Sequence, residues 1–358
     1  MRLSISTSDL VNLVAKIQTI VSENPKDPIS IIFLEAIKGQ IALTATDHRI
    51  TLRALASAHV EKAGAVTLPA KIFFQLILKL TLSPVEIEAD NRSAHIQSGT
   101  SHFMMSCMPP QEHLPFPSLS GGISLNWDNT LLRDCLVRSS FAAAPEDDKS
   151  ALKGVFVQLG RKIATFASSD RYRIACVRAE LSEEHAGTYI IPSLAAKKMI
   201  QLLETPDQKS KLTFLPDKVS LETGNFTLLT KLIEGPYPEI DSLIPLKAAD
   251  PIVMNRKDLM ALLSQLSIFA AHQAVRFTFT PHVLQLTAIN GDIGQGRASM
   301  PIHYTGPEFS IVFNFDYFLD ALNLSKDETM ELSLSGPHAH GLITDSTNSS
   351  YVLMPLNA

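Results

Sequence analysis

Apolar and polar residues alternate at positions 2–7, and an apolar helix face follows at the spacing i, i+3, i+4, i+7: Leu10, Leu13, Val14 and Ile17. The same succession of a short strand and an amphipathic helix returns at 122–139 and again at 251–266. Asn255 stands where the third of these helices needs an N-cap. The same strand–helix succession therefore begins three separate segments of the chain.

A second amphipathic helix follows in each copy, entered from a short strand that ends at Pro69, Pro192 or Asn314. Proline suits a helix entrance because the N–H that it lacks would be unpaired there. Each helix repeats the spacing of the first, with these apolar residues: Phe73, Leu76, Ile77 and Leu80; Ala196, Met199, Ile200 and Leu203; Phe315, Phe318, Leu319 and Leu322.

A polar turn recurs inside apolar, strand-like runs at Asp47, Asp170 and Asn290, which are 123 and 120 residues apart. This spacing indicates one domain copied three times. The order of strands and helices predicts an α+β fold of three similar domains, each with two helices packed on antiparallel sheets. Proline-rich segments at 108–122 and 234–251 separate the copies, and they predict domains at 1–121, 122–248 and 249–358.

The composition is that of an ordinary globular protein, with 45% hydrophobic and 19% charged residues. No apolar run is long enough to cross a bilayer, and no signal peptide is recognisable, so we expect a cytoplasmic protein. The three cysteines, Cys107, Cys135 and Cys176, form no C-x-x-C pair, which argues against a disulfide framework or a thiolate zinc site. A net charge of −5 means that any binding of nucleic acid requires locally segregated positive charge.

Residues that could carry catalysis or a cofactor are few. His338 and His340 form the closest histidine pair but lie in a Gly/Pro loop without further ligands, and no phosphate-binding loop is present, so we expect no metal and no cofactor. A hydrolase with Asp47 or Asp170 as general base, beside His48 or Arg173, is one alternative. A peptide-binding scaffold without affinity for DNA is another.

Three segments, 167–174 (ASSDRYRI), 231–239 (KLIEGPYPE) and 351–356 (YVLMPL), occur in an order and spacing that resemble the bacterial DNA sliding clamp, the β subunit of DNA polymerase III. The resemblance spans the chain and implies a head-to-tail homodimeric ring that encircles duplex DNA of any sequence and slides along it. It also implies that the ring tethers the polymerase III catalytic subunit, the clamp loader and other proteins with a clamp-binding motif, and that it catalyses nothing itself.

Such a ring needs weak phosphate attraction from its inner helices. Basic residues on or beside the first five predicted helices are candidates to face DNA: Lys16, Lys71, Lys79, Arg133, Arg138, Lys197, Lys198, Arg256 and Lys257. The alternative is that each is an ordinary solvated charge on the polar side of its helix. The sixth helix carries Asp316 and Asp320 and no base.

The chain departs from the family pattern at two positions near the expected DNA path. The family can have arginine where Asn24 stands and glutamine where Glu146 stands. Lys26 and Lys149 are possible substitutes for DNA contacts there.

The resemblance also implies a groove between the second and third domains that binds partner peptides through apolar anchor residues. Matched positions are Leu152, Ser169, Arg171, Tyr172, Arg173, Ile174, Pro238, Leu243, Val352, Leu353, Met354, Pro355 and Leu356. The alternative makes 352–356 a core or edge strand and places Leu152 and Ile174 in the interior. Ser242 and Asn357 stand where family members have arginine, so the rim is expected to differ.

For the contact between the two chains of the implied homodimer, the matched positions are Phe103 and Met105 on a strand of the first domain, and Ile268 and Phe269 at the end of a helix in the third. The alternative is that these apolar residues belong to the domain cores.

Overall fold

The computed structural model describes residues 1–358 except 22–30, 108–115, 117–120, 337 and 357–358. The described residues form two compact units, one of Met1–Arg133 with Lys198–Leu232 and the other of Asp134–Lys197 with Ile233–Ala358. Two helices, α3 (Asn129–Ser140) and α4 (Ser193–Leu202), run from one unit into the other.

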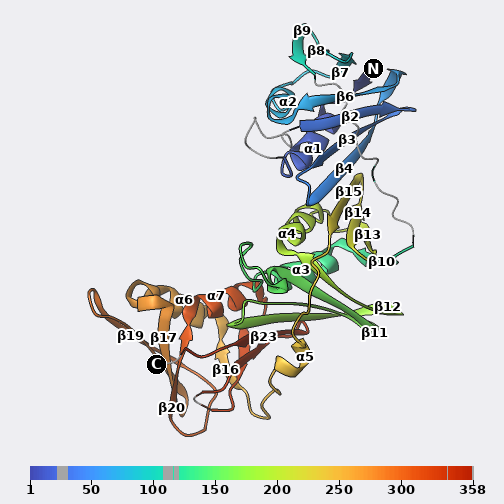
Figure 1. Ribbon diagram of the computed structural model, residues 1–358. Helices are drawn as coiled ribbons and strands as arrows, with labels where there is room; N and C mark the ends of the chain where they lie inside the picture. Colours follow the sequence, from blue (N-terminus) through green and yellow to red (C-terminus); the bar gives the residue numbers. More distant parts are fainter. Residues whose placement is uncertain (22–30, 108–115, 117–120, 337, 357–358) are drawn as a thin grey trace. The chain divides into compact units, whose positions relative to one another are not determined.

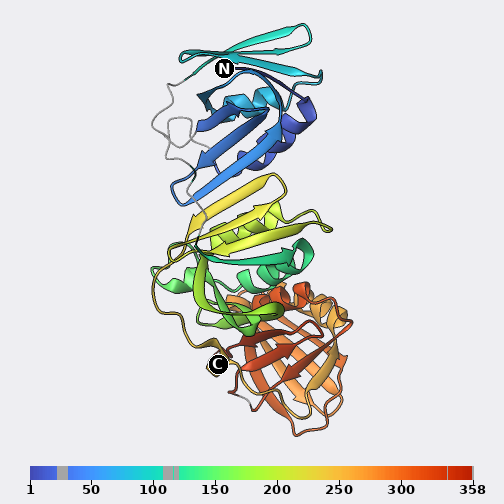
Figure 2. The ribbon, with the colours of Figure 1, turned by 90° about the vertical axis from the view of Figure 1, so that its right-hand side faces the viewer.

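The first unit holds two antiparallel sheets (Figures 1 and 2). The five-stranded sheet has the order β5 (His59–Lys62), β1 (Arg2–Ile5), β7 (Val85–Ala89), β8 (Ser93–Ser98) and β9 (Ser101–Ser106). The eight-stranded sheet has the order β10 (Ile123–Asp128), β13 (Lys209–Phe214), β14 (Lys218–Thr223), β15 (Phe226–Lys231), β4 (Ile50–Ser57), β3 (Gln40–Thr46), β2 (Ile31–Ile37) and β6 (Gly64–Pro69). In the first of these sheets, β9 is an edge strand.

Helices α1 (Thr7–Ile17) and α2 (Ala70–Ile77) pack against the β2–β4 part of the larger sheet (Figure 1). Ser6 caps α1, because its hydroxyl accepts a hydrogen bond from the backbone N–H of Asp9 at 3.2 Å. The predicted apolar face of α1 is buried in full. The prediction from periodicity is confirmed for this helix.

The second unit also holds two antiparallel sheets. One has the order β11 (Gly154–Ser169), β12 (Arg173–Pro192), β23 (Ser349–Leu353), β22 (Gly341–Thr344), β21 (Thr329–Ser333) and β16 (Ile252–Asn255). The other has the order β19 (Gly294–Pro301), β18 (Val283–Asn290), β17 (Ala274–Thr280) and β20 (Phe309–Asn314). In the second of these, β19 is an edge strand.

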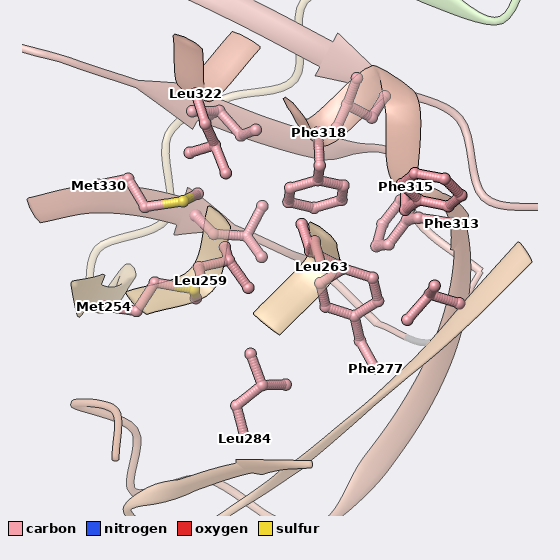
Figure 3. Packing of buried hydrophobic residues seen from close by; sticks show 14 of the residues in the cluster. Met254, Leu259, Leu263, Phe277, Leu284, Phe313, Phe315, Phe318, Leu322 and Met330 are labelled. Carbon is pink, nitrogen blue, oxygen red and sulfur yellow. The ribbon is translucent and has the colours of Figure 1, made fainter. Parts of the chain in front are cut away.

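Helices α6 (Arg256–Leu266) and α7 (Phe315–Leu324) contribute to the core of this unit. The unit also contains the short helices α5 (Ile240–Leu243), η1 (Ala151–Lys153), η2 (Ser267–Phe269) and η3 (Ala271–Gln273). Asn255 caps α6 by accepting from the N–H of Asp258 at 3.1 Å, as predicted. In the core, the Phe277 ring lies 4.8 Å from the Phe318 ring and 5.6 Å from the Phe313 ring, centroid to centroid (Figure 3). The α+β fold is confirmed. None of the helices in the described ranges is long and apolar enough to cross a membrane.

The strand that ends one copy adds to the sheet of the copy before it. Strand β15 pairs with β4, and Leu228 stands opposite Leu52. Strand β23 pairs with β12, and Tyr351 stands opposite Ala175. We call the region of β4, β15, α1 and the end of α4 the first joint, and the region of β12, β23, α7 and the end of α3 the second joint. Each joint lies within one unit.

Candidate functional site

The recurring Asp or Asn forms the turn in which it stands. Oδ1 of Asp170 accepts from the backbone N–H groups of Tyr172 and Arg173 at 3.0 and 3.1 Å. Oδ1 of Asp47 accepts in the same way from residues 49 and 50, at 2.9 and 2.6 Å, and Asn290 accepts from the N–H of Asp292 at 3.1 Å. These side chains stabilise tight turns between paired strands, and this structural task speaks against the hydrolase alternative.

The residues after Asp170 distinguish this turn from the others. Arg171 adopts a positive φ of 80° and its Nη1 lies 2.8 Å from Oδ2 of Asp148. The Arg171 guanidinium, followed by the hydroxyl and N–H of Ser150, holds the pKa of the Asp148 carboxyl well below its usual range. The Tyr172 side chain is 58% exposed. Arg171 and Tyr172 are therefore available at the surface, as their predicted place in the groove requires.

Arg173 was predicted among the groove residues that contact a partner, and the structure corrects this. Its guanidinium bonds Oδ2 of Asp170 at 2.9 Å, Asp320 on α7 and the carbonyl of Phe141 at 3.3 Å, and it lies 4.4 Å from the centre of the Tyr317 ring. With its side chain largely buried, Arg173 ties β12 to α7 and to the end of α3. The acidic character of α7 is explained in part, because Asp320 neutralises Arg173.

Five predicted groove residues are buried in the second unit: Leu152, Ser169, Ile174, Val352 and Leu353. Ile174 and Val352 are cross-strand partners and pack in one cluster with Ile240. These five residues cannot offer open side chains to a partner. The core-strand alternative was correct for 352–353, because β23 lies between β12 and β22 and has no free edge.

The remaining groove residues are accessible. Tyr172, Leu243, Met354 and Pro238 are exposed, and Pro355 and Leu356 are partly so. Two backbone hydrogen bonds hold the chain end: the N–H of Met354 donates to the carbonyl of Tyr172 at 2.9 Å, and that of Leu356 donates to Val312 at 2.8 Å. Met354, 37% exposed, is thereby fixed beside Tyr172 above the buried pair Ile174 and Val352.

The segment before α5 is anchored by an aromatic residue that sequence reasoning missed. The Tyr237 ring stacks on Phe156 with centroids 4.9 Å apart, and its hydroxyl donates to the Gly154 carbonyl at 3.4 Å. Burial raises the pKa of this hydroxyl above its usual range. Tyr237 lies in the segment KLIEGPYPE, so the signal was present, but the exposed Pro238 beside it was selected instead.

Six predicted bases are exposed and free for a phosphate: Lys71, Lys79, Arg133, Lys149, Lys197 and Lys257. Three others are only partly exposed. Lys16 pairs with Glu204, and Arg256 donates to the carbonyls of Asp327 and Leu322 at 2.7 and 2.9 Å. Lys198 stands on the part of α4 that belongs to the first joint. Lys26 lies outside the described residues. Glu146 accepts a hydrogen bond from the hydroxyl of Ser193 at 2.7 Å.

Arg138 is not a DNA-facing residue. It is 1% exposed, and its guanidinium reaches Asp345 at 3.1 Å and Asp134 at 2.9 Å. It was selected as a basic residue on a predicted helix, α3, whose other base, Arg133, is exposed. One turn further on, the hairpin between β22 and β23 covers the helix and supplies Asp345.

The predicted contact residues between copies differ in exposure. Phe103 and Ile268 are exposed and Phe269 is partly so, but Met105 is only 8% exposed and belongs to the packing of its own unit. Its neighbour Met104, which was not selected, is 73% exposed. Strand alternation places 103 and 105 on one face and 104 on the other. Ile289 and Ile293, near the start of β19, add exposed apolar surface.

No group of three His, Cys, Asp or Glu side chains in the described ranges is arranged to hold a metal ion. Cys135 and Cys176 are buried free thiols, and burial raises the pKa of Cys176 to about 11.

Comparison with known proteins covers the whole chain. Three family models match in order: DNA polymerase III beta subunit, N-terminal domain, at residues 1–119; central domain, at 126–239; and C-terminal domain, at 241–357. A protein named Beta sliding clamp from Chlamydia trachomatis is 33% identical over 362 residues, which cover 99% of this chain and 87% of the relative. The protein of that name from Pseudomonas putida is 25% identical over 368 residues, covering 99% and 100%.

Solved structures show the same similarity. The DNA polymerase III subunit beta from Pseudomonas aeruginosa superposes with a TM-score of 0.96 at 21% identity, and each chain is covered in full. A sliding clamp (DNA polymerase III subunit beta) from Bartonella birtlesii, solved bound to griselimycin, gives a TM-score of 0.93 at 26% identity, again over both complete chains.

Proposed function

The chain belongs to the DNA polymerase III beta subunit family, the beta sliding clamps, and is a processivity factor; from this premise we propose that two copies close head to tail into a ring around duplex DNA. The ring would slide on DNA and hold the polymerase there. We further propose that it does so in the cytoplasm, without catalysis of its own, and that its domains divide at 121 and 248.

The observation that carries the ring is a pair of free sheet edges. At each joint, the last strand of one copy of the domain pairs with the strand that follows the Asp turn of the preceding copy, as β15 does with β4 and β23 with β12. The corresponding last strand of the first copy is β9, and the strand after the turn of the third copy is β19. Both are edges. A third joint of the same kind, formed between two molecules, closes a head-to-tail dimer.

The internal registers predict which residues meet at that third joint. Leu228 faces Leu52 and Tyr351 faces Ala175. By the same register, Phe103 of one molecule should face Gly296 of the other. The absence of a side chain at Gly296 makes room for Leu266 and Phe269 of the same molecule, since a Cβ there would lie 2.8 and 3.0 Å from them. By the same alignment Ile268 corresponds to Phe141, which contacts Tyr351 at the second joint with ring centroids 5.7 Å apart. Phe103 and Ile268 thus occupy the positions of a packed aromatic pair.

The oligomeric state tests this arrangement. Light scattering should give the mass of two chains for the protein and of one chain for Phe103→Arg, because the substitution places a charge in an apolar contact. Leu246→Arg is the matched control, since Leu246 is an exposed apolar residue that belongs to neither edge strand, and it should remain dimeric. A dimeric Phe103→Arg protein would contradict the proposed joint.

For DNA we propose that the six exposed bases attract the phosphate backbone without reading sequence. The clamp-binding peptides of the polymerase III catalytic subunit, the clamp loader and other partners would place apolar anchors against Tyr172, Leu243 and Met354, with Pro355 and Leu356 beside them. Each well-buried anchor is worth about 1.5–3 kcal/mol. Affinities of that size permit partners to exchange on one ring.

A further inference from the structure

A cavity of about 240 Å³ lies at the first joint. It is lined by Ala15, Lys16, Thr19, Ile20, Leu52, Lys198, Gln201, Leu202, Glu204 and Leu228. Half of these residues are apolar; Ala15 and Leu202 are partly exposed, and Ile20, Leu52 and Leu228 are buried, the last two as cross-strand partners. Since a water molecule occupies about 30 Å³ in the liquid, the cavity has room for an aromatic ring with a short polar arm.

Two side chains that line the cavity are smaller than their counterparts at the second joint. There, Phe141 follows α3 and Tyr351 stands on β23, and their rings are in contact. The corresponding residues of the first joint are Thr19, which follows α1, and Leu228 on β15. At the second joint two aromatic rings in contact therefore stand where Thr19 and Leu228 line the cavity of the first.

The charged lining residues sum to one positive charge. Lys16 is already engaged, because its Nζ donates to the Gln201 carbonyl at 3.0 Å and to the Glu204 carboxylate. Lys198 is partly buried, and no carboxylate in the described part of the chain lies within ion-pair distance of it. Burial lowers the pKa of Lys198 below its usual value, with Asp47 opposing the shift. An anion beside Lys198 would restore the solvation that its ammonium group has lost.

We infer that this cavity is a binding site for a small monoanionic carboxylate with an apolar, ring-sized body, the acid group on Lys198 and the body against Ala15 and Leu202, above the buried pair Leu52 and Leu228. A monoanion matches the single net positive charge of the lining. A phosphate dianion or a DNA backbone fits less well, since Glu204 repels it and neither would cover the apolar lining residues.

The test uses 4-phenylbutyrate as probe and its neutral analogue 4-phenylbutanamide, each titrated into the full-length protein by calorimetry and ligand-detected NMR. We expect saturable binding of one acid per chain, weakened about tenfold in the neutral analogue and about tenfold in Lys198→Gln. Thr19→Phe rebuilds one ring of the second joint and should abolish binding. Met354→Ala should bind the acid as the unmodified protein does, which excludes the proposed peptide groove.

Equal affinity of the unmodified protein and Lys198→Gln would overturn the assignment, as would the absence of saturable binding at millimolar acid. Lys198→Gln decides the question even if Thr19→Phe fails to fold, because Lys198 is not packed in a core. Displacement of the acid by a short DNA duplex, in Met354→Ala as well, would show that the cavity is a phosphate contact and would also refute the inference.

Discussion

The first and second joints share one backbone plan and differ in how side chains fill it. At the first, Leu52 faces Leu228 and a cavity remains. At the second, Ala175 faces Tyr351, whose ring packs on Phe141. Thr19 and Leu228, which line the cavity, are replaced at the second joint by Phe141 and Tyr351, whose rings are in contact. Strand pairing therefore determines where two of the repeated domains meet, and side-chain volume determines how much space remains between them.

Charges at corresponding positions of the two joints also differ. Lys16 and Arg138 occupy equivalent places near the ends of α1 and α3, but Lys16 pairs with a largely exposed Glu204 and Arg138 is buried against Asp345. Lys198 on α4 corresponds to Asp320 on α7, which neutralises Arg173. The second joint holds β23 and the Met354 segment in position, through the pairing of β23 with β12 and the hydrogen bond from the Met354 N–H to the Tyr172 carbonyl.

The largest expected effect is a loss of stability that differs between the two equivalent bases, Arg138 and Lys16. Arg138→Ala leaves the Asp345 carboxylate buried without its partner, so the free energy of unfolding should fall by about 3–5 kcal/mol. Lys16→Ala removes a partly exposed pair and should cost less than about 1 kcal/mol. Urea unfolding followed by circular dichroism measures both. Equal losses would mean that the two joints are held in the same way.

Exchanging the joint residues tests the role of side-chain volume. Tyr351→Leu should open a cavity at the second joint and lower the free energy of unfolding by about 2–3 kcal/mol. The reverse change at the first joint, Leu228→Tyr, places a ring next to the existing cavity. It should change the free energy of unfolding by less than about 1.5 kcal/mol. The same unfolding experiment applies. A larger loss for Leu228→Tyr than for Tyr351→Leu would contradict the contrast between open and sealed joints.

The surface of the second joint should bind partner peptides through the segment after β23. The double change Met354→Ala with Leu356→Ala removes two accessible apolar anchors and should weaken a labelled clamp-binding peptide of the polymerase by about tenfold or more, measured by fluorescence anisotropy. Leu246→Ala serves as control and should leave the affinity unchanged. The dimer should persist in light scattering. A loss of the folded dimer would instead favour the core-strand interpretation for the whole of 352–356.

The smallest effect concerns the turn of the second joint. The pKa of Asp148 is lowered by Arg171, so the stabilisation from this carboxylate is complete above its unfolded pKa of about 3.9 and is lost as the pH falls toward the lower folded value. Arg171→Gln should raise that pKa toward the usual range, as followed by carboxyl ¹³C NMR. His48 has the corresponding place and a φ of 66° at the first joint, and His48→Gln should not move the Asp148 resonance. An unmoved pKa in Arg171→Gln would rule out the ion pair in solution.

Much of the fold could be predicted because it is encoded locally. The spacing of Leu10, Leu13, Val14 and Ile17 is a property of one helix, and the Asp170 turn depends on N–H groups two and three residues further along the chain. Such signals need no knowledge of the rest of the chain.

The failures involve residues whose partners are remote in sequence. Arg138 has the pattern of an exposed base until Asp345, far along the chain, folds over it. Val352 and Leu353 resemble an accessible chain end, but pairing with β12 and β22 buries them. The cavity at the first joint has a signal, Thr19 and Leu228 in place of Phe141 and Tyr351. That signal becomes readable only when the copies are aligned by their strand registers.

The central claim is that two chains form a closed ring around DNA, and its most direct test is topological. The protein is loaded onto nicked circular DNA, separated from free protein by gel filtration, and counted before and after the DNA is cut once to make it linear. A ring held by encirclement stays on the circle and slides off the linear ends. Equal retention on circular and linear DNA would contradict the account.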